Sequence, residues 1–178
     1  MGPSTPRQRH PEGTVEVVRE AMTMALYLSI VLLAMLVALP TKNGVRSVQG
    51  GPVAHGLGLV ELIWGTALGL ALAHWFSFQL TARVFGGGKV TRRDVDTGVA
   101  QLAAAIGVAA FCTVPVFLFD ETRDVQMAAF VPAAIVGAAG YAVGRTGGRS
   151  RQWSLVLGGV AAFLGLTVAG IKNLLLGH

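Results

Sequence analysis

Apolar runs alternate with short polar segments along the whole chain. The five runs cover residues 21–39, 57–82, 97–119, 125–144 and 153–171. A hydrocarbon core of about 30 Å requires about 20 helical residues at 1.5 Å per residue, and every run is close to this length or longer. The pattern predicts an all-α protein, an integral membrane helical bundle of five transmembrane helices.

The first polar segment, residues 1–13, has three prolines, two glycines and no apolar side chain of any size except Met1. Such a segment buries too little surface to fold, so we expect a disordered cytoplasmic tail followed by a single transmembrane domain over residues 14–176. The helix that follows is predicted to begin at about Val15. A cleaved signal peptide is the alternative, but the apolar run exceeds the usual length and lacks a cleavage pattern before Pro40.

The other polar segments predict how the runs are connected. Residues 40–56 form the longest loop, rich in Gly and Pro. Thr91 and Asp94 have the spacing of a capping box, which predicts a helix start after the three glycines at 86–88. Residues 120–124 form a tight acidic connection, so the third and fourth runs should be antiparallel neighbours. Pro115 lies inside the third run, where it can kink a helix.

Composition and charge support a multi-pass protein of a cell membrane, with the lipid bilayer as its first partner. Hydrophobic residues make up 53% of the 178 residues and charged residues 13%, against about 45–50% and 25% in soluble domains. The net charge of +5 would suggest nucleic acid in a soluble protein, but here the cations lie between apolar runs and no nucleic-acid partner is expected. Eleven arginines against three lysines are typical of bacteria with Ala-, Gly- and Arg-rich proteomes.

The distribution of Lys and Arg predicts the orientation in the membrane. With the N-terminus inside, ten basic residues fall in cytoplasmic segments (Arg7, Arg9, Arg19, Arg83, Lys89, Arg92, Arg93, Arg145, Arg149 and Arg151), and four fall outside (Lys42, Arg46, Arg123 and Lys172). Cytoplasmic loops of membrane proteins carry the excess of positive charge. Five spans with the N-terminus inside and the C-terminus outside satisfy this rule.

Three polar residues within the runs are candidates for function. If Arg83 reaches the interface, His74 lies nine residues away, about 13.5 Å and near the middle of the bilayer, whereas Glu61 reaches the opposite interface. Gln101 lies near the cytoplasmic end of the next run. An unpaired imidazole in hydrocarbon costs about a few kcal/mol, so His74 should turn toward a polar partner and away from lipid. A structural His74 with a hydrogen bond and a His74 that exchanges protons are both compatible with the sequence.

Small residues recur every third or fourth position in several runs. They are Gly65, Gly69 and Ala73 in the second run, Gly137, Gly140 and Gly144 in the fourth, and Gly165 in the fifth. Small side chains allow two helix backbones to approach closely. We expect these residues to pack against other helices of the chain, a second copy of it, or another membrane protein.

No catalytic, cofactor or metal motif accompanies these features. The single cysteine, Cys112, excludes an internal disulfide and a Cys-rich metal site, and the six serines and four histidines fit no hydrolase or metalloprotease pattern. No cofactor and no catalytic residue is therefore predicted.

Three hypotheses remain for the function. The first is a structural or associative protein that works through its Gly and Ala faces. The second is transport of a small molecule, an ion or a proton by way of His74. The third and weakest is a membrane enzyme without a recognised motif. A water-accessible cavity reaching His74 would favour transport, whereas a dry, hydrogen-bonded His74 would favour the structural role.

Overall fold

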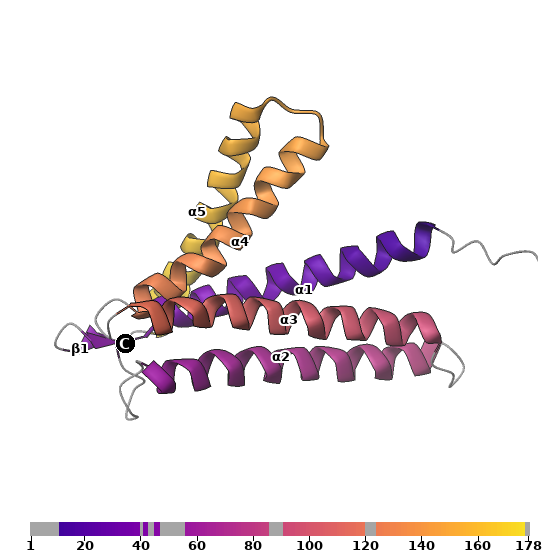
Figure 1. Cartoon of the computed structure of the whole chain (residues 1–178), viewed down its shortest axis with the longest axis horizontal. Helices are drawn as coiled ribbons and strands as arrows, with labels where there is room; N and C mark the ends of the chain where they lie inside the picture. Colours follow the sequence, from indigo (N-terminus) through magenta and orange to yellow (C-terminus); the bar gives the residue numbers. More distant parts are fainter. Residues whose placement is uncertain are drawn as a thin grey trace, which may run out of the picture.

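The computed structural model describes residues 11–39, 41–42, 45–46, 56–85, 91–119 and 124–176. The helices are α1 (Pro11–Val37), α2 (Gly56–Phe85), α3 (Arg92–Leu118), α4 (Asp124–Thr146) and α5 (Arg151–Leu176), shown in Figure 1. Between α1 and α2, the short strand β1 (Thr41–Lys42) pairs antiparallel with β2 (Val45–Arg46), inside the segment predicted as a loop.

Four helices are long and apolar enough to cross a membrane, and they contain the stretches Thr14–Val37, Gly56–Thr81, Arg92–Leu118 and Asp124–Thr146. The chain therefore has the helical, multi-pass character of a membrane protein. Membrane crossing by α5 remains a prediction, as does the side of the membrane on which each terminus lies.

Capping and polar first turns make the helices longer than the apolar runs. Helix α1 begins at Pro11, inside the predicted tail of residues 1–13, and residues 1–10 lie outside the described part of the chain. Helix α3 begins five residues before the apolar run, because Thr91 Oγ1 accepts a hydrogen bond from the Asp94 backbone N–H at 3.3 Å. The Asp94 carboxylate accepts the Thr91 N–H in return at 2.8 Å. The predicted capping box is confirmed.

Helix α3 lies between α1 and α2. Helices α1 and α2 both pack along it and meet each other only over a short stretch (Figure 1). The apolar core they share is formed by Leu28, Leu32, Leu36, Leu59, Ile63, Ala67, Ala71, Ala105, Ala109 and Cys112, all buried. A hydrogen bond of 3.0 Å from Trp64 Nε1 to Thr113 Oγ1 also joins α2 to α3.

Helices α4 and α5 form an antiparallel hairpin that leans away from the other three helices at its turn (Figure 1). Their backbones touch. A Cβ added to Gly140 would lie 2.8 Å from the Leu157 carbonyl oxygen, and one added to Gly144 would lie 2.8 Å from Ser154 Cα. Gly165 of α5 faces Leu33 of α1, where an added Cβ would be 3.5 Å from a methyl carbon.

The face of α2 that packs in this chain differs from the predicted one. A Cβ added to Gly65 or Gly69 would meet no atom within 4 Å, so neither residue contacts another described helix. The packed stripe instead contains Leu59, Ile63 and Ala67, which are fully buried. It is offset by two positions, about 200° around the helix, and its Leu and Ile side chains make more van der Waals contacts with a neighbouring helix than glycine does. Packing of Gly65 and Gly69 against a second chain remains a prediction.

A buried carboxylate joins α2 and α4 at one end of the bundle. Asp124 is 1% exposed, and its Oδ2 accepts the Gly56 backbone N–H at 3.0 Å while Oδ1 accepts that of Val125 at 2.5 Å. Gly56 adopts φ +53°, a left-handed conformation that glycine tolerates best.

Candidate functional site

A cavity of about 380 Å³ opens where α1 and α2 fail to meet. Its lining is Glu20, Thr23, Met24 and Tyr27 from α1, His74 from α2 and Gln101 from α3. The opening follows from the fold, because α1 and α2 each pack on α3 and share few contacts of their own.

Gln101 is the most deeply buried polar group of this cavity. Its side chain is 3% exposed, and its Nε2 donates a hydrogen bond to Glu20 Oε2 at 3.4 Å. Its Oε1 is buried without any hydrogen-bond partner among the described residues. A buried oxygen left unpaired costs about 1–3 kcal/mol, so a shift of the Gln101 side chain that exposes this oxygen to a donor in the cavity would be favoured.

Glu20 lines the cavity and also belongs to a series of ion pairs that links α1 to α3. Arg19 Nη2 is 3.5 Å from Glu20 Oε1 and 3.8 Å from Glu16 Oε1, and Glu16 also pairs with Arg93 at the start of α3. The Arg19 side chain is 68% exposed, so its charge is largely screened by solvent. These pairs tie the first turns of α1 to α3 and keep a carboxylate at the cavity wall.

His74 is exposed and forms no hydrogen bond or ion pair with the described part of the chain, so the polar partner that we expected for it is absent there. It nevertheless faces the same cavity as Glu20 and Gln101. Glu61 is also exposed but lies near the opposite end of α2 and does not line the cavity. The structure thus brings two of the three predicted polar residues together.

Sequence reasoning missed the contribution of α1. Glu20 and Tyr27 are seven residues apart, which returns a helix to within about 20° of the same face, and Thr23 and Met24 lie between them on that face. This spacing was a usable signal for one polar face of α1. That this face meets His74 and Gln101 depends on how three helices are rotated about their axes.

The polar lining ends where the apolar core begins. Leu28 and Leu32 on α1 are fully buried against Ala67 and Ala71 of α2 and Ala105 of α3. The cavity is therefore a chamber bounded on one side by packed hydrocarbon, and it does not continue as a polar channel through the described residues.

Within the described residues, no three His, Cys, Asp or Glu side chains lie close enough to hold a metal ion. Comparison of the chain with protein-family models, curated proteins and solved structures finds no match. The chemistry of the cavity itself therefore carries the functional argument.

Proposed function

We propose that the protein transports a proton or a small cation bearing N–H or O–H donors, and that the cation first binds between Glu20, Gln101 and His74. The observation that carries this proposal is the cavity itself, which brings the Glu20 carboxylate, the Gln101 amide and the His74 imidazole to one lining. A second supporting fact is that the cavity reaches His74, the arrangement that favours transport over a purely structural histidine.

The groups around the cavity suit a cationic donor. Glu20 contributes negative charge, and a shift of the Gln101 amide would let its Oε1, which has no partner among the described residues, accept one hydrogen bond. Ammonium, a small protonated amine and hydronium each carry positive charge and several donors, so one such ion could satisfy both oxygens. An imidazole has one nitrogen that donates a hydrogen bond and one that accepts, which suits a proton relay.

Release on the far side requires movement, because Leu28 and Leu32 close the space beyond the cavity. The short contact between α1 and α2 makes this pair of helices the natural place for such movement. The chamber in this structure then corresponds to a state open on one side.

Flux into proteoliposomes tests the proposal. A pH-sensitive dye trapped inside would report proton flux under an imposed potential, and radiolabelled methylammonium would report uptake of a small cation. We expect Glu20→Gln to lower the flux at least about tenfold, the effect of losing about 1.4 kcal/mol of charged interaction. His74→Gln should abolish proton flux if His74 relays the proton.

Glu61→Gln is the matched control, since Glu61 is an exposed carboxylate outside the cavity. It should leave the flux unchanged. Equal losses in Glu20→Gln and Glu61→Gln, or no flux of either probe through the parent protein, would disprove transport through this cavity.

Association with another helix is the second candidate function, and the outer face of α2 favours it. Glu61, Gly65, Gly69, Ala73 and Ser77 follow one another at spacing four and are all exposed. The small residues that follow Glu61 along this face would admit a close partner helix. Gly65→Leu should then reduce self-association measured by cross-linking in membranes, whereas Ala110→Leu on the exposed face of α3 should not.

A further inference from the structure

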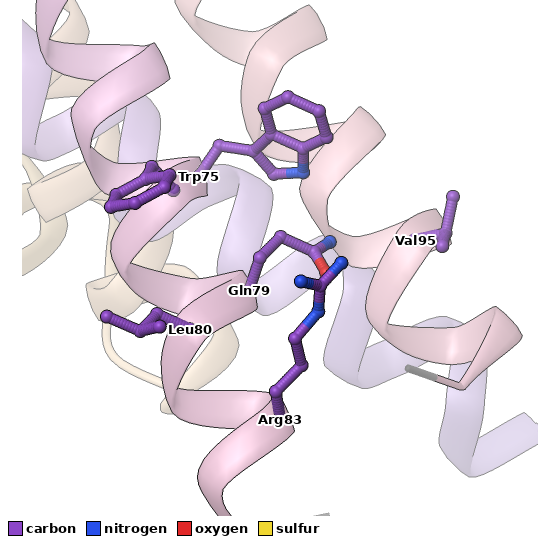
Figure 2. A pocket seen from close by; sticks show the side chains of 6 residues that line it. Trp75, Gln79, Leu80, Arg83 and Val95 are labelled. Carbon is purple, nitrogen blue, oxygen red and sulfur yellow. The ribbon is translucent and has the colours of Figure 1, made fainter. Parts of the chain in front are cut away.

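A second cavity, of about 430 Å³, lies between α2 and α3 at the end of the α2 span. It is lined by Trp75, Phe76, Gln79, Leu80 and Arg83 from α2 and by Val95 from α3. Trp75, Gln79 and Arg83 are spaced by four and share one face of the helix. In Figure 2 the Arg83 side chain turns back along α2, so that its guanidinium lies beside the Gln79 amide and below the Trp75 indole.

The polar side of this cavity is rich in hydrogen-bond donors without partners. Trp75, Gln79 and Arg83 form no side-chain hydrogen bond or ion pair with the described part of the chain. An arginine offers five N–H donors in a planar fork, and tryptophan and glutamine add further N–H groups. Converging donors with one positive charge match an acceptor-rich anion, and the guanidinium fork matches the geometry of a phosphate.

The apolar side of the same cavity distinguishes a lipid from a free anion. Phe76 and Leu80 are 69% and 55% exposed, and they lie three residues toward the span from Gln79 and Arg83 respectively. The apolar stretch of α2 ends at Thr81, so Arg83 lies just beyond it, at the level expected for headgroups. A ligand with a phosphate at Arg83 and a hydrocarbon chain along Phe76 and Leu80 would contact both halves.

The position of the Trp75 indole is set by a glycine on α3. A Cβ added to Gly98 would lie 2.6 Å from both Trp75 Cδ1 and Trp75 Nε1, so the ring rests directly on the α3 backbone. Neither acidic residue near the start of α3 pairs with Arg83 in this cavity. The Asp94 carboxylate is engaged by Thr91, and Asp96 is exposed outside the cavity lining.

From these features we propose that the α2–α3 cavity binds the phosphate headgroup of an anionic phospholipid, with one acyl chain against Phe76 and Leu80. The proposal is independent of transport through the cavity at Gln101. Arg83 contacts the phosphate, Gln79 and Trp75 donate further hydrogen bonds, and the apolar side chains hold the chain.

Retention of lipid by the full-length protein tests this site. Purified protein would be titrated with short-chain phosphatidylglycerol, with the matching phosphatidylcholine, and with inorganic phosphate, and bound ligand would be counted by native mass spectrometry. We expect phosphatidylglycerol to bind best and Arg83→Gln to weaken it about tenfold, as for the loss of one charge-assisted contact. Arg83→Lys should restore part of the affinity, because it keeps the charge but loses the fork.

Arg151→Gln is the matched control, since Arg151 is an exposed arginine at the start of α5. Trp75→Phe keeps an aromatic side chain but removes the N–H together with the five-membered ring that rests on Gly98, so it should weaken binding, and a thermal melt of the same variant shows whether the fold is kept. Equal weakening in Arg83→Gln and Arg151→Gln would mean diffuse charge attraction and would overturn the site. Inorganic phosphate binding as tightly as phosphatidylglycerol would overturn the lipid, as would equal binding of phosphatidylcholine.

Discussion

The glycines within helices differ in what surrounds them, and this decides how each tolerates a methyl group. At Gly140 an added Cβ would lie 2.7 Å from Ala161 Cβ and 2.8 Å from the Leu157 carbonyl oxygen. A backbone oxygen cannot rotate away as the end of a flexible side chain can. At Gly65 the same methyl would meet open space.

We therefore expect Gly140→Ala to lower the free energy of unfolding by about 1–3 kcal/mol, because α4 and α5 must separate to admit the methyl group. Gly65→Ala should be neutral or stabilising by about 0.5–1 kcal/mol, since alanine favours the helix. Thermal denaturation of both variants in one detergent, followed by circular dichroism, measures the difference. Equal destabilisation of the two would contradict the packing described for α4 and α5.

The spacing of small residues was visible in the sequence, but it did not indicate which of them contact another helix of the chain. The α2 stripe at Gly65 and Gly69 and the α4 stripe at Gly140 and Gly144 look alike in sequence. They differ because α2 also carries Leu59 and Ile63 on its opposite face, and packing those larger side chains against the other helices turns the glycines outward. His74 shows the same limit: its position in an apolar run was evident, but the carboxylate and amide that share its cavity come from two other helices.

At the scale of whole helices, the pairing of α4 with α5 can be tested by a designed disulfide. A Cβ at Gly137 would lie 3.5 Å from Ala162 Cβ, within the range of about 3.5–4.5 Å found in disulfides. In a Cys112→Ala background, Gly137→Cys with Ala162→Cys should form an intramolecular bond under mild oxidation. After trypsin cleaves in the turn at residues 145–151, the two helices should stay joined until reductant is added.

Gly65→Cys with Ala162→Cys serves as the control, because no atom lies within 4 Å of a Cβ at Gly65. Its tryptic fragments should separate without reductant. If the Gly137 and Ala162 pair also separates, α4 and α5 do not pack through the faces described here.

The presence of each helix could be predicted because an apolar run or a capping motif in the local sequence favours it. An apolar run of spanning length leaves its backbone no hydrogen-bond partner except its own turns, so a helix is required. The start of α3 followed from Thr91 and Asp94, whose side chains and backbone amides satisfy each other locally. Two features were not predicted: the residue at which α1 begins, and the short strands β1 and β2. Both lie in polar segments, where the hydrophobic pattern carries no information.

At the scale of the whole molecule, one measurement decides on which side of the membrane the C-terminus lies. Ten of the fourteen Lys and Arg residues fall in segments assigned to the cytoplasm, as listed for the sequence. Because cytoplasmic segments retain positive charge, five spans would place the C-terminus outside. A phosphatase reporter that folds only outside the cytoplasm should be active when fused after His178.

The same reporter inserted at Gly148, in the turn between α4 and α5, should be inactive, because that turn is assigned to the cytoplasm. Activity at Gly148 together with inactivity after His178 would reverse the orientation. Activity at both positions would mean that α5 does not cross.

The cavity at Gln101 is a property of the whole molecule that no local pattern could reveal. It exists because α3 holds α1 and α2 apart, which depends on the relative rotation and tilt of three helices. No pattern within a single helix distinguishes the residues that line the cavity from their neighbours. Only the assembled bundle leaves Gln101 Oε1 buried without a partner among the residues that the structure describes.

The hydrogen bond between Asp124 and Gly56 has a consequence for the order in which the protein is made. The two residues are 68 positions apart in sequence, so α2 and α3 are both synthesised before the carboxylate that completes the first turn of α2 exists. During that interval the Gly56 N–H must be satisfied by water or by the insertion machinery. The beginning of α2 thus reaches its final form only after α4 has emerged from the ribosome, and a nascent chain arrested before residue 124 would still have an open end at Gly56.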